Sequence, residues 1–311
     1  MYNYITENVK SQENNINTDI SITNNRSPGT TESNKAVDLY KKKAISAEAR
    51  TQNLYKAYME LYKETNLQYY YKRAEAVINC HDYAMFRHYY DPNDTAKLKK
   101  LNRCKNPMCT FCQWVEAKKR YKFLSASIAM LQDYKLNHIV ITIENCTADV
   151  LQSRLNLLHK IITATMRHFK VRGYYRATEI TYNQKEKTYH PHCHLLITDF
   201  IPIHELQAFV AEAYKVAVPN YTRDYCICYA KRATNYIKEL CKYVTKPTDF
   251  KTEELKEMIK HESLYHVRKI ACGGIIKDTI KNAKMLLSAY EASQKTELEL
   301  YGFTDLLHYL K

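Results

Sequence analysis

Long apolar runs are absent from this chain. Its 311 residues contain no apolar stretch that approaches the roughly 20 residues needed by a membrane-spanning helix. The opening decapeptide is polar, so no signal peptide is expected, and we predict a cytoplasmic protein with no membrane partner. In that reducing compartment the ten cysteines are better interpreted as thiols or metal ligands than as disulfides. No internal repeat is found.

Positive charge is the main compositional feature. Lys and Arg number 47 against 33 Asp and Glu, which gives a formal net charge of +14. The basic residues are spread along the chain instead of forming one tail, and this balance favours a polyanionic partner. A hydrophobic content of 45% suffices for one large or two modest domains with a core.

Composition and periodicity divide the chain into five parts. Residues 1–35 are rich in Asn, Ser and Thr and are predicted to be a disordered tail. Leu and Tyr at three- and four-residue spacing predict a helical segment over 36–79. Residues 80–133 contain a cysteine-rich module followed by a basic helix, residues 134–250 interleave strands with helices, and 251–311 is predicted to be helical.

The central part predicts a mixed fold. Strands are expected over 138–145, 174–183 and 190–200, with a polar turn joining the last two into a hairpin. Helical spacing of apolar residues predicts helices over 148–169 and 203–217. A strand, a helix and then a hairpin indicate an α+β fold with a largely antiparallel central sheet flanked by helices. A further strand and helix are expected over 224–230 and 233–246.

A pair of histidines marks the second strand of the hairpin. His192 and His194 are two residues apart, so strand alternation points both imidazoles to one face and Cys193 to the other. Two neutral imidazoles can bind a divalent ion, although ordinary surface or core histidines are the alternative. Glu179 on the preceding strand returns beside them as a third ligand, which leaves open positions for polarising a phosphate. Imidazole suits zinc or manganese, whereas the carboxylate suits magnesium or manganese.

Glu239 and Tyr243 share one face of a predicted helix because they are four residues apart. A tyrosine can act as a covalent nucleophile, and a nearby carboxylate can serve as general base for a second attacking group such as water. Lys242 and Lys246 flank the pair and are candidates for phosphate contacts. The alternative is an ordinary helix pair on a solvated, charged face.

Cysteines cluster once in the sequence. Cys104, Cys109 and Cys112 follow a Cx4CxxC spacing, and Cys80 lies upstream as the fourth ligand of a tetrahedral zinc site. His81 stands beside Cys80 and is the alternative fourth ligand. The remaining cysteines are interpreted as core or surface positions: Cys146, Cys193, Cys226, Cys228, Cys241 and Cys272.

Five motifs in order carry a family resemblance. They are CKNPMCTFCQW, HIVITIEN, YYRATEITYNQKEKTYHPHCHLLI, KELCKYVTK and RKIACGGIIK. With these motifs the chain resembles the rolling-circle replication initiators of small Gram-positive plasmids, a branch of the HUH endonuclease superfamily. The resemblance covers about two thirds of the chain and implies an HUH-like sheet in a nickase domain over 134–250.

The resemblance also implies a metal centre and a nucleophile. His192 and His194 would bind a catalytic Mn²⁺ or Mg²⁺ with Glu179 as third ligand, and His190 is a less favoured substitute. Tyr243 would nick one strand at the plasmid's double-strand origin, form a 5′-phosphotyrosine and carry out strand transfer. Glu239 would assist termination.

Zn²⁺, DNA and host proteins are the further partners that the resemblance implies. Zn²⁺ would be structural in the cysteine cluster, whose family positions fall on Cys104, Cys109 and Cys112. The DNA partner would be origin DNA with an exposed single strand, and a host helicase and DNA polymerase would be recruited.

The chain departs from the family after CQW, where basic residues are usual. Val115 and Glu116 come first here, and the basic run of predicted DNA contacts starts later, at Lys118, Lys119 and Arg120. Two other functions fit the sequence. One is an HUH transposase or mobilisation relaxase, and the other is a non-catalytic, zinc-dependent DNA-binding regulator.

Overall fold

The computed structural model describes residues 33–81, 84–88, 97–218, 227–229, 250–264, 266–300 and 304–308, with Ile237, Leu240 and Cys241 between them. Contacts divide the chain into two units. The first comprises 1–42, 81–102 and 298–311, and the second comprises 43–80 and 103–297. The predicted tail lies outside the described residues up to position 32, and residues 33–35 begin the first helix.

The first unit contains a small antiparallel sheet in the order β2-β1-β8. Its strands are β1 (Ala84–His88), β2 (Lys97–Leu101) and β8 (Thr304–His308). The sequence patterns did not predict these strands. The region between Cys80 and Cys112, which contains β1 and β2, lacks a clear alternation of apolar and polar residues. The prediction of a helical region over 251–311 is corrected by β8, which is a strand.

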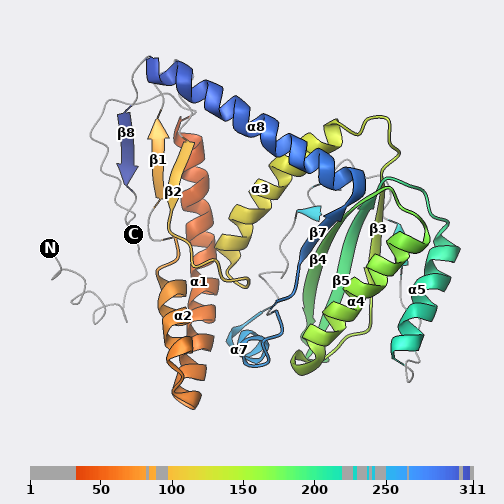
Figure 1. Ribbon diagram of the computed structural model, residues 1–311. Helices are drawn as coiled ribbons and strands as arrows, with labels where there is room; N and C mark the ends of the chain where they lie inside the picture. The colour runs from red at the N-terminus through yellow and green to blue at the C-terminus, as the bar shows by residue number, and fades with distance from the viewer. Residues whose placement is uncertain are drawn as a thin grey trace. The chain divides into compact units, whose positions relative to one another are not determined.

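The second unit is built on a five-stranded sheet in the order β6-β3-β5-β4-β7, with every neighbouring pair antiparallel (Figure 1). The strands are β3 (Asn137–Thr142), β4 (Gly173–Asn183), β5 (Thr188–Ile197), β6 (Ile227–Tyr229) and β7 (Ile270–Gly273). The predicted α+β class with an antiparallel sheet and flanking helices is therefore confirmed.

Helices cover both faces of this sheet. On one face, α4 (Ala148–His168) and α5 (Ile203–Ala217) pack on Ile139, Ile141 and Leu195 (Figure 1). On the other face, α3 (Thr110–Ala129) and the start of α8 (Gly274–Leu300) pack on a second cluster that includes Tyr175, Ala177 and Leu196. Alternate strand residues therefore feed two separate cores.

The helical segment predicted over 36–79 is two helices, not one. The first is α1 (Ser33–Thr65) and the second is α2 (Gln68–Ile78). Asn66 separates them with a left-handed φ of 55°, a conformation that asparagine tolerates better than most residues. Tyr62 and Tyr71 pack their rings across the turn with centroids 5.4 Å apart. The break between the two helices was not predicted because the helical spacing of Leu and Tyr does not report turn chemistry.

The C-terminal part begins with α7 (Thr252–Lys260), which is tied to α1 by charge. The ammonium of Lys256 lies 2.6 Å from a carboxylate oxygen of Glu64 and 3.5 Å from one of Glu60. None of the helices that the structure describes is long and apolar enough to cross a lipid bilayer.

Candidate metal centres

The histidine pair and Glu179 meet on one face of the sheet. In the β4–β5 pairing Glu179 stands directly opposite His192, and Ala177 stands opposite His194. The Glu179 Oε2 atom lies 3.1 Å from Nε2 of His194 and 3.4 Å from Nε2 of His192. Ligands about 2.1 Å from an ion and at right angles would be about 3 Å apart, so the spacing fits a shared metal ion. The three residues form one of two groups that could hold a metal among the described residues.

Electrostatics favour an ionised Glu179. Burial by itself acts to raise the pKa of this carboxyl, but hydrogen bonds to His192 and His194 outweigh burial and hold the pKa well below its usual range. The side chain is therefore a carboxylate at neutral pH, which is the form that binds a metal. Its burial on the sheet fixes the direction in which the oxygens point.

The outer nitrogens of the two imidazoles face other protein groups. Nδ1 of His194 lies 3.1 Å from Nε2 of His138 on β3, and the two rings stack with centroids 5.3 Å apart. Nδ1 of His192 lies 3.4 Å from the backbone oxygen of His190. Contacts of this kind orient metal-binding imidazoles and leave the opposite nitrogen for the ion. His138 was not predicted as a site residue, although it lies at the start of a predicted strand.

His138→Ala is expected to weaken divalent-metal binding by about 10–100-fold, because it removes the ring that orients His194. Titration of the purified chain with Mn²⁺, followed by calorimetry, measures this loss. His204→Ala is the matched control, since His204 lies on α5 with a side chain that is 80% exposed. Equal Mn²⁺ affinity in wild type and His138→Ala would show that His138 only packs.

His190 is not brought into this group. Its Nδ1 lies 2.7 Å from Oδ1 of Asn145, and its Nε2 lies 3.2 Å from the hydroxyl of Thr142. Both ring nitrogens therefore face polar partners near the hairpin's turn end, and His192 and His194 are the pair that shares Glu179.

Four cysteines form the second group. Sγ of Cys80 lies 3.7 Å from that of Cys109 and 3.6 Å from that of Cys112, and Sγ of Cys104 lies 3.6 Å from that of Cys112. Four sulfurs at about 2.3 Å from a tetrahedral zinc ion would be separated by about 3.8 Å, so the spacing suits such an ion. The four thiols supply all four ligands of a tetrahedral ion, so His81 is not needed as a ligand.

Local structure places these thiols. Cys80 follows the end of α2, Cys109 is the N-cap residue of α3, and Cys112 lies in the first turn of that helix. Hydrogen bonding to the other thiols, together with burial, raises the pKa of Cys80 and Cys104, whereas the same hydrogen bonds lower the pKa of Cys112. Metal binding would replace the shared protons and is therefore expected to depend on pH.

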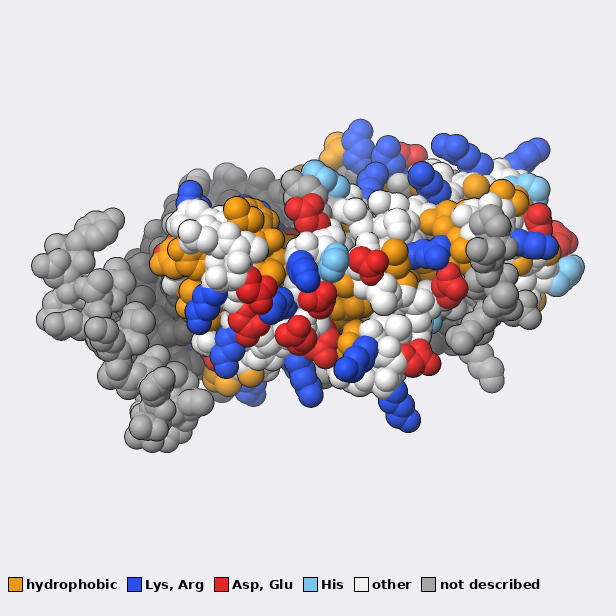
Figure 2. Space-filling view, turned by 90° about the horizontal axis from the view of Figure 1, so that it is seen from below, with side chains coloured by type: hydrophobic (Ala, Val, Ile, Leu, Met, Phe, Trp, Pro, Cys, Tyr) orange, Lys and Arg blue, Asp and Glu red, His pale blue; other side chains and the backbone are white. Residues whose placement is uncertain are grey.

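The basic run on α3 is divided by exposure. Lys118 and Lys119 are exposed, whereas Arg120 is half-buried. The departure from the family pattern has a structural role here, because Val115 is buried and Glu116 accepts a 2.6 Å hydrogen bond from Arg103. On the face seen in Figure 2, Lys and Arg side chains are interspersed with Asp and Glu, so the excess positive charge is not gathered there.

The predicted nucleophile and its neighbours lie outside the described residues: Glu239, Lys242, Tyr243 and Lys246. Leu240 and Cys241 beside them are described, and both are buried. They belong to the cluster that packs on Tyr175 and Ala177, on the sheet face that carries Glu179. Leu240 and Cys241 are therefore anchored to the face that carries the candidate metal centre.

The other cysteines form no metal group among the described residues. Cys146, Cys193 and Cys241 are buried thiols, and Cys272 is half-buried. Cys226 lies outside the described residues, and only the backbone of Cys228 is described.

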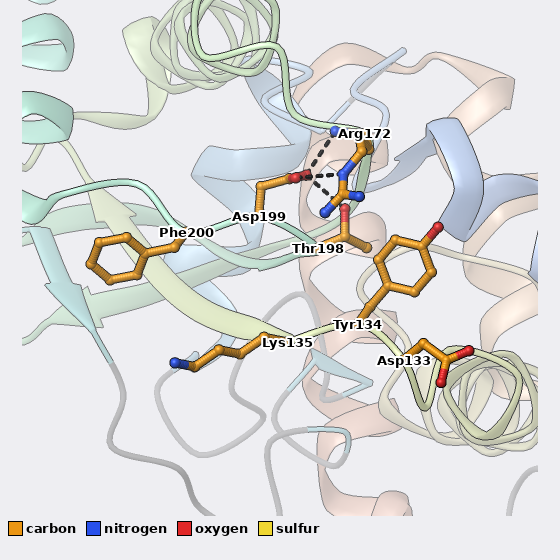
Figure 3. Close-up of a pocket in the computed structure, with 7 residues that line it drawn as sticks. All are labelled: Asp133, Tyr134, Lys135, Arg172, Thr198, Asp199 and Phe200. Atoms are coloured by element: carbon orange, nitrogen blue, oxygen red, sulfur yellow. Dashed lines mark hydrogen bonds and ion pairs between the residues drawn. The ribbon is translucent and has the colours of Figure 1, made fainter.

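A separate polar cavity of about 550 Å³ lies beside the end of β5 and the start of β4 (Figure 3). Arg172 donates a 2.7 Å hydrogen bond to Asp199, and its guanidinium lies over the ring of Tyr134 at 5.0 Å. This arginine is therefore already neutralised by its own carboxylate, and the exposed ring of Phe200 forms part of the rim.

Known proteins share the region that holds these groups. A family model described as "Replication protein" matches residues 95–203. "Protein rep" of a Bacillus species is 29% identical over 152 residues, 45% of this chain and 48% of the relative. "Protein rep" of Staphylococcus aureus is 33% identical over 108 residues, 32% of this chain and 47% of the relative. The chain is a relative of these replication (Rep) proteins.

A longer match is to "Protein rep" of Streptococcus pneumoniae, with 26% identity over 234 residues, 68% of this chain and 72% of the relative. By contrast, the match spans about half the length of the Bacillus and Staphylococcus Rep proteins. No solved structure gives a significant match. The family model and the matching Rep proteins confirm the resemblance that the motifs predicted.

The matched Rep region encloses most of both candidate metal centres. It contains Glu179, His192 and His194 together with three of the four cysteines. Cys80 and Tyr243 fall outside it. The matched region therefore contains the three strands β3, β4 and β5 with the candidate metal-binding residues and the helix α3, whereas β6 and β7 lie outside it.

Proposed function

We propose that this chain initiates rolling-circle replication of a plasmid by nicking one strand of the double-strand origin with Tyr243. The observation that carries the proposal is the convergence of Glu179, His192 and His194 on one sheet face, inside the region shared with Rep proteins. Leu240 is buried on that same face three residues before Tyr243, and this spacing in the predicted helix supports a position for Tyr243 beside the metal centre. Residues 134–250 would then be an HUH nickase domain.

The chemistry follows from the residue types. Glu179, His192 and His194 would hold Mn²⁺ or Mg²⁺, which polarises a phosphate and offsets developing negative charge when bound. The Tyr243 phenol oxygen attacks the phosphorus and loses its proton to solvent. A Tyr–O–P bond forms as the P–O3′ bond breaks, which leaves a 5′-phosphotyrosine and a free 3′-hydroxyl that can prime synthesis. The four cysteines would hold a structural Zn²⁺.

DNA contacts complete the proposal. Exposed Lys118 and Lys119 on α3 would bind the strand backbone, as would Arg120, Lys242 and Lys246. A host helicase and DNA polymerase would extend the primer. The names "Protein rep" and "Replication protein" that these relatives bear favour replication over transposition or mobilisation.

The test is incubation of the purified chain with an end-labelled single-stranded origin oligonucleotide in Mn²⁺, Mg²⁺ or no divalent ion, followed by a denaturing gel. A metal-dependent covalent protein–DNA species is the expected product. Tight binding without cleavage in every divalent ion would instead favour the non-catalytic regulator.

Glu239→Ala is expected to nick normally but to resolve the second strand-transfer step at least about tenfold more slowly, because a general base typically contributes 10²–10⁴-fold. Accumulation of the covalent species on a substrate with two nick sites measures this defect. Glu212→Ala, which removes an exposed carboxylate on α5, is the matched control. Normal termination by Glu239→Ala would assign that carboxylate a structural role only.

A further inference from the structure

Arg120 has buried donors that no described group satisfies. Its Nε and Nη2 atoms are shielded from solvent and lack a hydrogen-bond partner, and the same holds for the hydroxyl of Tyr175. Shielded donors are rarely left unpaired in native proteins, and a bound ion or ligand can supply the acceptor that they lack. The three polar atoms therefore point to a missing acceptor.

These groups converge on the metal-bearing face of the sheet. Arg120 precedes Leu124 by one helical turn, and Leu124 packs in the same cluster as Tyr175 and Cys241. The charge of Arg120 also acts on Cys241. Burial raises the pKa of the Cys241 thiol to about 12, and the nearby guanidinium opposes that rise. The same opposing effect acts on Tyr175, whose pKa is raised by burial.

Lys269 adds a second positive charge. Its backbone oxygen accepts a 2.8 Å hydrogen bond from the Thr178 amide, which places Lys269 just before β7 and alongside β4. Burial, with the charge of Arg120, lowers the pKa of Lys269 to about 8. Within the described residues, no ion pair neutralises Lys269 or Arg120, whereas Arg103 and Arg172 have Glu116 and Asp199.

We propose that Arg120, Lys269 and Tyr175 bind a backbone phosphate of the DNA strand. The inference rests on the proposed function, since it assigns this phosphate to the strand held for nicking. A guanidinium presents a donor fork that matches phosphate oxygens, and an ammonium and a phenol hydroxyl add single donors. Tyr175 lies four residues from Glu179 along β4, roughly 13 Å away. The site therefore takes a phosphate other than the one at the metal centre and would fix the register of the strand.

Titration of the full chain with inorganic phosphate at constant ionic strength, without added divalent ions, tests the site by calorimetry. Saturable binding of one phosphate is expected. Arg120→Gln and Lys269→Gln should each weaken it at least about tenfold, because hydrogen bonds to charged groups are the strong ones. Lys160→Gln is the matched control, since it removes the same charge from an exposed position on α4 and should leave phosphate affinity unchanged.

Two gentler variants guard against misfolding. Arg120→Lys keeps the charge but loses the fork, and Tyr175→Phe removes one oxygen only. Both should fold, as judged by circular dichroism, and both should bind phosphate more weakly than wild type. Absence of saturable phosphate binding in wild type, or an equal loss in Lys160→Gln and Arg120→Gln, would overturn the site.

The outcome is separable from that of the proposed function. A chain that forms the Tyr243 adduct but binds no phosphate at Arg120 refutes the phosphate site alone. A chain that binds phosphate through Arg120 and Lys269 but forms no covalent species with any divalent ion refutes nicking. In that case the site stands, although the phosphate belongs to DNA that is bound without cleavage.

Discussion

Tyr243→Phe is expected to reduce formation of the covalent protein–DNA species by at least about a thousandfold, because loss of a covalent nucleophile removes the attacking atom itself. Affinity for the origin oligonucleotide should not change, since the substitution deletes one oxygen and keeps the ring. Quantifying the adduct on a denaturing gel and binding by fluorescence anisotropy separates the two effects.

Tyr236→Phe provides the control for that experiment. Tyr236 belongs to the same predicted helix, seven residues before Tyr243 in the sequence, and should keep full adduct formation. Persistent adduct in Tyr243→Phe would remove Tyr243 from the nucleophile's role. Loss of the adduct only in Tyr236→Phe would transfer that role to Tyr236.

Loss of the four-cysteine group should produce the largest change in stability. Cys112→Ser is expected to abolish stoichiometric zinc binding and to lower the free energy of unfolding by at least about 3 kcal/mol, since zinc bound only by the native state contributes its binding free energy to folding. The midpoint of thermal unfolding should fall by roughly 6–12 °C.

Elemental analysis of the purified chain and calorimetry test this result together. Cys272→Ser is the control, because Cys272 is half-buried and lies outside both metal groups. It should retain zinc and unfold near the wild-type temperature. Full zinc content in Cys112→Ser would contradict a four-thiolate site.

Local periodicity predicted the elements that support the candidate site. The helix expected over 203–217 is α5 with the same bounds, and the hairpin strands differ from expectation by only a few residues. Strand alternation also placed His192 and His194 on one face, and hairpin geometry brought Glu179 to them. These features depend on neighbours in sequence, which is why residue patterns report them.

Features that depend on distant contacts were not predicted. The four residues of β7 carry little pattern, and their pairing with β4 is fixed by the fold around them, including a Gly274 whose φ of 55° and close approach to the Arg172 carbonyl leave no room for a Cβ. His138 gains its role only through the β3–β5 register. Arg120 was grouped with Lys118 and Lys119, although its side chain is half-buried and theirs are exposed.

The β4–β5 hairpin limits how this protein can be re-engineered or can diverge. Inserting one residue into either strand between Glu179 and His192 would move the carboxylate to the opposite face from the imidazoles. The turn over 184–187 carries no such constraint, because its length does not alter which strand positions face each other once the ladder is kept. A peptide tag or fluorophore site placed in that turn should leave the metal centre intact.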